Sequence, residues 1–159
     1  MVGLDSLHRA VAGNCAPRHQ RHGAEAGLRI WIDADAASRR VMELAFQKAK
    51  RLAVEVVLVA RRRLHTPPGN PLVSAVRVEG GAAGADQYIA SQAVAGDLVV
   101  TQDVPLAARL TPQGITVLDP RGQDHPAECH PAEPPTPGRA REAFAAALEG
   151  ALARLRRWR

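Results

Sequence analysis

Along the middle of this chain, short apolar runs alternate with segments in which apolar residues recur every three or four positions. The runs are residues 28–33, 54–60, 72–79, 97–101 and 114–118. Each run is rich in strand-prone residues and is bounded by turn-forming or polar residues, which predicts a strand. The run at 54–60 is apolar except for Glu55, a pattern typical of a strand buried on both faces of a parallel sheet.

The segments between the runs are predicted helices. Ser38 is suited to cap a helix that continues to about residue 52, with one apolar stripe at helical spacing. A shorter helix is predicted over residues 85–94, with Asp86 in its first turn, and another is predicted to open at Pro105. Strands that alternate with helices, through connections too long for hairpins, predict an α/β fold with a mainly parallel five-stranded sheet and helices on both faces.

The two ends of the chain depart from this alternation. Residues 1–27 show no sustained periodicity and are predicted to be an N-terminal extension. Residues 28–122 then form the α/β domain. Six prolines fall within residues 120–138, so we place a proline-rich linker at 123–138. Residues 139–159 resume helical spacing, with arginines near the end where the helix dipole favours them. This basic C-terminal helix is free to pack on the domain or on a partner.

Composition narrows the class of protein. A chain of 159 residues with 46% hydrophobic residues has the size of one domain and can bury a core. No apolar window reaches the roughly 18 residues of a membrane span, and no signal peptide is evident, so we expect a cytoplasmic protein without a membrane partner. The two cysteines are too few for a disulfide framework.

Net charge is a weak guide to the partner. The formal charge is +5, which is often a sign of a polyanionic partner. However, residues 139–159 hold six Arg against two Glu, whereas residues 28–119 hold eleven basic against nine acidic residues. The surplus therefore lies mostly in the C-terminal helix. The five aromatic residues are too few for a sheet that stacks on RNA bases.

Four aspartates fall where ligands bind in open parallel sheets, at the carboxyl ends of the strands. Asp33 and Asp35 follow the first strand, Asp103 follows the fourth, and Asp86 begins the helix that precedes the fourth. Carboxylates gathered at one edge repel one another unless a hard cation neutralises them, and Mg²⁺ or Mn²⁺ prefers such oxygen ligands. A site of this kind favours hydrolysis of a phosphodiester, because the metal activates water and stabilises charge on the phosphate.

A basic loop follows the second strand, close to the predicted acidic edge. Its three consecutive arginines, Arg61, Arg62 and Arg63, could hold an anionic substrate. Each of these features also has an ordinary structural interpretation. Aspartate is common in turns and at helix N-termini, and a charged loop is usually solvated. The shared edge is what favours a functional site.

Other polar residues are assigned structural roles. Asp97 is interpreted as a turn residue and Asp119 as the end of the fifth strand, while Glu43 is solvated or approaches the site from the first helix. A zinc site is a minor alternative, because its candidate ligands lie in weakly patterned segments. Those ligands are Cys15, His19, His22, His125, Cys129 and His130. Neither a glycine-rich phosphate loop nor a serine nucleophile elbow is present.

Four segments in chain order carry a family resemblance. They are RIWIDADA at 29–36, GADQYI at 84–89, GDLVVTQDVPLA at 96–107 and DPRG at 119–122. In these segments the chain resembles the bacterial YaiI/YqxD family of largely uncharacterised proteins, which looks like a relative of PIN domains. The resemblance resumes at residues 141–155, which look like the final helix of the family.

The resemblance implies a PIN-like three-layer sandwich and a nuclease site. PIN-like nucleases hold one or two divalent ions with acids that correspond to Asp33, Asp35, Asp86 and Asp103, and Thr101 matches the threonine of their Thr-x-Asp motif. The chain also departs from the family. Ala37 and Ser38 stand where members usually have Cys-Pro, and Gln87 stands where a second acid often follows. These departures imply weaker metal binding.

Three functions follow as hypotheses. The leading one is a PIN-like nuclease dependent on Mg²⁺ or Mn²⁺, with RNA as the expected substrate. The second is a haloacid-dehalogenase-like phosphatase, in which Asp33 is the nucleophile and Asp35 the acid and base, although a catalytic lysine and the usual Thr or Val at Ala37 are missing. The third is a non-catalytic RNA-binding or interaction protein that retains the fold.

Overall fold

A computed structural model describes residues 27–81, 83–122 and 137–157 of the chain. The predicted N-terminal extension and almost all of the predicted linker lie outside these residues. So do all six cysteines and histidines of the zinc hypothesis. The domain boundaries drawn from the sequence therefore stay predictions.

The centre of the molecule is a parallel sheet of five strands. They are β1 (Arg29–Asp33), β2 (Glu55–Ala60), β3 (Val73–Arg77), β4 (Leu98–Val100) and β5 (Thr116–Leu118). Their order across the sheet is β3-β2-β1-β4-β5, and every neighbouring pair is parallel. The chain therefore builds outward from β1 to β3 and then returns to the other side of β1. The boundary between β1 and β4 is a topological switch point, where ligands of open α/β sheets bind.

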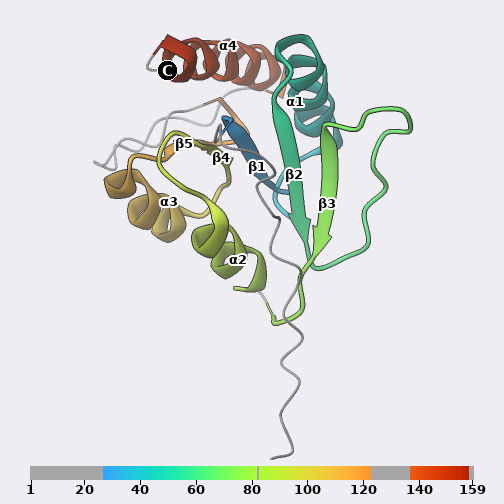
Figure 1. The fold of residues 1–159 in the computed structure, drawn as a ribbon, viewed down its shortest axis with the longest axis vertical. Helices are drawn as coiled ribbons and strands as arrows, with labels where there is room; N and C mark the ends of the chain where they lie inside the picture. The colour runs from blue at the N-terminus through green and yellow to red at the C-terminus, as the bar shows by residue number, and fades with distance from the viewer. Residues whose placement is uncertain (1–26, 82, 123–136, 158–159) are drawn as a thin grey trace, which may run out of the picture.

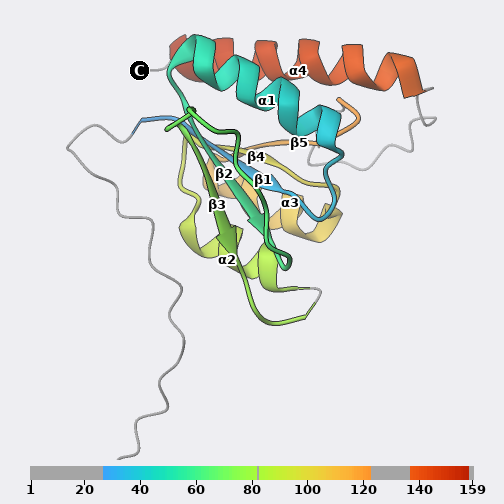
Figure 2. The same cartoon turned by 90° about the vertical axis from the view of Figure 1, so that its right-hand side faces the viewer.

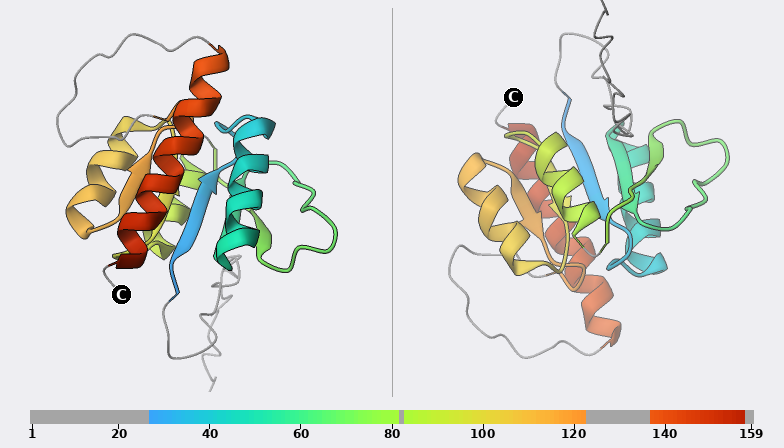
Figure 3. Two further views of the ribbon diagram at one scale, coloured as in Figure 1. Left: turned by 90° about the horizontal axis from the view of Figure 1, so that it is seen from above. Right: turned by 90° about the horizontal axis from the view of Figure 1, so that it is seen from below.

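Helices cover both faces of the sheet, which confirms the predicted α/β fold with three layers. One face carries α1 (Arg39–Leu52) and α4 (Pro137–Arg157), and the other carries α2 (Gly84–Gln92) and α3 (Val104–Leu110), which is followed by the short 3₁₀ helix η1 (Thr111–Gln113). Figures 1 and 2 show the helical layers on either side of the sheet from perpendicular directions, and Figure 3 looks onto α1 and α4 from above and onto α2 and α3 from below. Each face has its own core, one centred on Ile30 and Ile32 and the other on Trp31.

The helix starts show which side chains fix the loops near the carboxyl edge. The predicted cap Ser38 is the N-cap of α1, where its Oγ accepts a hydrogen bond from the N–H of Val41. Helix α3 begins at Val104, one residue before the predicted start, so Pro105 occupies its second position. The reason is Asp103, whose Oδ1 accepts from the N–H of Leu106 at 2.5 Å and so caps the helix.

The C-terminal helix packs back onto the domain. Phe144, Leu148 and Leu152 of α4 are fully buried in the core that it shares with α1. Gly122, in the turn after β5, has φ +85° and lies directly against the backbone of Ala143 and Phe144 in α4. A Cβ at this position would collide with that backbone. Glycine is therefore required here both for its conformation and for the close approach of the helix.

Among the described helices, none has the length and apolar character of a membrane span.

Candidate functional site

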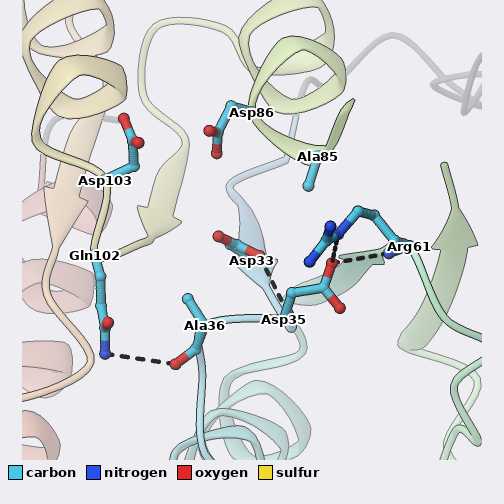
Figure 4. Close-up of a pocket in the computed structure, with 8 residues that line it drawn as sticks. All are labelled: Asp33, Asp35, Ala36, Arg61, Ala85, Asp86, Gln102 and Asp103. Carbon is cyan, nitrogen blue, oxygen red and sulfur yellow. Dashed lines mark hydrogen bonds and ion pairs between the residues drawn. The ribbon is translucent and has the colours of Figure 1, made fainter. Parts of the chain in front are cut away.

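A hollow of about 330 Å³ opens at the carboxyl edge of the sheet, beside the switch point. Its lining includes all four aspartates singled out in the sequence. The lining residues are Asp33, Asp35, Ala36, Arg61, Ala85, Asp86, Gln102 and Asp103. Figure 4 shows the carboxylates of Asp33, Asp86 and Asp103 facing the same space. They come from the end of β1, the first turn of α2 and the loop between β4 and α3, segments that are distant in the sequence but adjacent in the fold.

Asp33 is the most buried acid of the hollow, with 8% of its surface exposed. Burial raises the pKa of Asp33, while a hydrogen bond from the backbone N–H of Asp35 to its Oδ1, at 3.1 Å, lowers it. The negative charges of Asp35 and Asp103 raise the pKa further. Asp33 therefore lies in an environment that disfavours its charged form.

Asp86, which lines the hollow from α2, lies in a similar electrostatic environment. Burial raises the pKa of Asp86, and the charges of Asp103 and Asp33 raise it as well, while Arg109 lowers it. Three carboxylates thus interact through a shared space, as expected for a site that binds a cation or another positively charged group.

Asp103 and Thr101 have local partners. The Oγ1 of Thr101 accepts a hydrogen bond at 3.1 Å from the N–H of Asp103, whose own carboxylate caps α3. Thr101 is fully buried and does not line the hollow. Its hydroxyl helps to fix the loop that carries Asp103.

Asp35 faces the basic loop rather than the other acids. Its Oδ2 accepts from the backbone N–H of Arg61 at 2.9 Å and from the Nε of Arg61 at 3.2 Å, as Figure 4 shows. Arg62 lies 3.8 Å from Asp35 Oδ1 and donates to the carbonyl of Ala34 at 3.4 Å. Arg63 is exposed and is not part of the lining. Arg61 therefore lines the hollow, Arg62 lies beside it and Arg63 lies outside it.

The types of side chain in the hollow suit a divalent metal ion, but their arrangement does not. Among the described residues, the lining holds four carboxylates and no sulfur or imidazole ligand, which is the set that Mg²⁺ or Mn²⁺ prefers. However, within the described part of the chain no group of three or more His, Cys, Asp or Glu side chains is arranged to hold a metal ion. Asp35 is drawn toward Arg61 and Asp103 toward the start of α3. Metal binding would therefore require these carboxylates to move closer together than they stand here.

The remaining acids lie elsewhere. Glu43 pairs with Arg39 on the exposed side of α1 at 3.1 Å and does not line the acidic hollow. Asp119 accepts from the N–H of Arg121 at 2.6 Å and so stabilises the turn after β5. Sequence reasoning missed Gln102, whose Nε2 donates to the carbonyl of Ala36 at 3.5 Å across one wall of the hollow. Its position inside the Thr-x-Asp motif was the available signal.

The fold and the hollow together define an α/β protein with an acidic site at the switch point of a parallel sheet. A family model described as "Uncharacterized BCR, YaiI/YqxD family" matches residues 31–129. The chain belongs to this family, as its four sequence segments predicted.

The curated relatives, which come from bacteria, carry a family-level name. The chain is 52% identical over 96 residues to a UPF0178 protein of Geobacter sulfurreducens, covering 60% of this chain and 63% of the relative. It is 47% identical over 96 residues to the UPF0178 proteins of Syntrophobacter fumaroxidans and Myxococcus xanthus, covering 60% of this chain and 62% of each relative. The chain thus matches less than two thirds of the length of these relatives. No solved structure gives a significant match.

Proposed function

We propose that this protein is a PIN-like, metal-dependent nuclease that hydrolyses phosphodiester bonds, with RNA as its substrate. The observation that supports the proposal is the convergence of Asp33, Asp86 and Asp103 from three separate segments on one hollow. Burial and the charges of neighbouring carboxylates make the charged forms of Asp33 and Asp86 costly in the folded protein. Carboxylates whose charges destabilise the folded protein are found most often at sites where a bound ligand compensates the destabilisation.

Asp33, Asp35, Asp86 and Asp103 would hold Mg²⁺ or Mn²⁺ in the proposed nuclease. The bound ion supplies Lewis acidity and lowers the pKa of bound water. Thr101 acts indirectly, through its hydrogen bond to the backbone of Asp103. Arg61, whose side chain is 53% exposed, would contact a substrate phosphate while its ion pair orients Asp35.

The phosphatase alternative is less well supported. The mechanism of that class uses a lysine beside the nucleophilic aspartate, and this chain contains only Lys48 and Lys50. Both lie in α1, away from the acidic hollow, and Lys48 pairs with Glu149 of α4 at 3.1 Å. Trapping of a phosphoaspartate at Asp33 would nonetheless establish that alternative in place of the nuclease.

The test is cleavage of single-stranded RNA by the purified full chain with Mn²⁺, Mg²⁺ or EDTA. We expect cleavage with Mn²⁺ or Mg²⁺, and loss of at least about a hundredfold in rate for Asp33→Asn combined with Asp103→Asn, because each removes a charge that the metal needs. Glu43→Gln is the control, since it removes a carboxylate that lies outside the hollow.

Two results would overturn the proposal. One is the absence of metal-dependent cleavage of RNA or DNA by the folded protein. The other is cleavage that persists unchanged in the double variant. Binding of RNA without cleavage would instead favour a non-catalytic RNA-binding protein that has kept the fold.

A further inference from the structure

A second hollow, of about 180 Å³, lies next to the acidic one. The two share Ala36 and Gln102 in their linings, so they are neighbours across the hydrogen bond from Gln102 to Ala36. The second hollow is formed by the start of α1, the turn after β5 and the first turns of α4. Its charged lining residues are Arg40, Arg121 and Arg141. We call it the arginine hollow.

Among the described residues, those that line the arginine hollow include no acid. Arg121 is held by Asp119, through its Nε at 3.1 Å, and keeps half of its side chain exposed. Within the part of the chain that the structure describes, Arg40 and Arg141 have neither an ion pair nor a hydrogen bond of their side chains. They also line a third hollow, of about 220 Å³, whose acid, Glu43, is paired with Arg39. Among the described residues, the guanidinium groups of Arg40 and Arg141 thus have no ion-pair partner, while that of Arg121 is paired with Asp119.

The first turn of α4 adds to this positive character. It contains no acidic residue, and the N-terminus of a long helix carries a partial positive charge that favours anions. The turn that holds Arg121 is fixed by the close contact of Gly122 with α4. The arginines are therefore presented from three packed elements rather than from one flexible loop.

We propose that the arginine hollow binds a phosphate group of the same polynucleotide strand whose neighbouring phosphodiester enters the acidic hollow. Guanidinium groups bind phosphate through two parallel hydrogen bonds, which suits them to hold a backbone without reading its sequence. A cluster of aspartates repels a polyanion, so the adjacent arginines supply the attraction that the acidic hollow lacks. The shared wall at Ala36 and Gln102 is what makes one strand a suitable ligand for both hollows.

This inference rests on the proposed nuclease function, and it is tested through binding in EDTA, where no cleavage occurs. The probe is a fluorescent single-stranded RNA of twelve nucleotides, titrated at several salt concentrations with the wild type and with Arg40→Gln combined with Arg141→Gln. We expect at least a tenfold loss of affinity in the double variant, and a slope of log K against log salt that is shallower by about 1.4, since each contact with a single strand contributes about 0.7.

Arg51→Gln combined with Arg154→Gln is the control, because it removes two charges from the same helices, α1 and α4, near their C-terminal ends. A circular dichroism spectrum and a melting curve establish that both double variants fold. Unchanged affinity and slope in the Arg40 and Arg141 variant, or an equal loss in the control, would overturn the proposal. It would also be overturned if inorganic phosphate bound as tightly as the strand, which would indicate a site for a free anion.

The binding and cleavage results separate the two proposals. Cleavage of RNA by the wild type, with no effect of the Arg40 and Arg141 substitutions on binding, would support the nuclease proposal and contradict binding of the strand in the arginine hollow. Binding that depends on these arginines, without cleavage under any metal condition, would support binding in the arginine hollow and contradict the nuclease proposal. Absence of RNA binding by the wild type would overturn the subsite directly.

Discussion

Aspartates lie at both edges of the sheet, but their surroundings differ. At the amino edge, Asp97 is 1% exposed, and its carboxylate accepts from the backbone N–H groups of Arg29 and Val94 and from the indole Nε1 of Trp31, at 3.1–3.2 Å. At the carboxyl edge, Asp33 and Asp86 face other carboxylates, and their pKa values are raised. Burial alone does not distinguish the two edges, because Asp33 is buried as well.

The difference lies in what each carboxylate faces. Asp97 faces N–H donors that the fold must satisfy, so its charge stabilises the junction of β1 and β4. Asp33 and Asp86 face other carboxylates in the hollow, so their charges oppose folding unless a ligand compensates them. Substitutions at the two edges are therefore expected to have opposite effects on stability.

The largest effect is expected for Asp97→Ala. It leaves three buried or half-buried N–H donors without their acceptor, and each such group costs about 1–3 kcal/mol. We expect the free energy of unfolding in urea to fall by about 3–5 kcal/mol. A decrease in the free energy of unfolding of less than about 1 kcal/mol would contradict the structural role of Asp97 and the contrast between the two edges.

A smaller decrease in the free energy of unfolding is expected for Gly122→Ala. This substitution tests whether residues near the carboxyl edge also stabilise the fold. The new Cβ would meet the backbone of Ala143 and Phe144, and the residue would keep a positive φ. Displacement of α4 should lower the free energy of unfolding by about 2–4 kcal/mol. Ala95→Ser, at an exposed position, is a control of similar size. A Gly122→Ala protein as stable as the wild type would contradict the close packing of α4.

The smallest effect, with the opposite sign, is expected for Asp86→Asn. Because the folded protein raises the pKa of Asp86 above 3.8, the charged form is disfavoured, and stability is lost as pH rises through the folded pKa. The variant should therefore be more stable than the wild type at pH 7, by roughly 0.2–0.5 kcal/mol after solvent screening. The gain should shrink as pH falls toward 4. Thermal melting across this range is the measurement, and a destabilised variant at pH 7 would contradict mutual repulsion in the hollow.

The sequence was sufficient to predict the order and type of the elements. Alternating apolar runs and helical stripes mark them directly, and the cap at Ser38 is a local signal. The cap at Asp103 is not among the predictions, which assign this residue to the acidic site and open the helix at Pro105. The packing of α4 does not follow from the sequence, because an apolar stripe does not identify the surface that covers it. Contacts with Phe144 and Gly122 decide it only in three dimensions.

The site was predicted in part for the same reason. Strand ends share an edge in a parallel sheet, so the position of Asp33 and Asp103 could be inferred from the chain order. The partners of the side chains could not be inferred. Asp35 binds Arg61, which is 26 positions away, and Asp97 binds Trp31, which is 66 positions away. These contacts depend on how the strands align, which no local pattern records.

The central claim is the proposal that the carboxylates of the hollow bind a divalent cation, for which they would move closer together than they stand here. The most direct measurement is a calorimetric titration of the full chain with Mn²⁺, repeated on the double variant Asp33→Asn, Asp103→Asn and on Glu43→Gln. We expect the wild type and Glu43→Gln to bind Mn²⁺ with the same affinity and the double variant to bind at least about a hundredfold more weakly. Absence of Mn²⁺ binding by the folded wild type, or equal binding by the double variant, would contradict the claim.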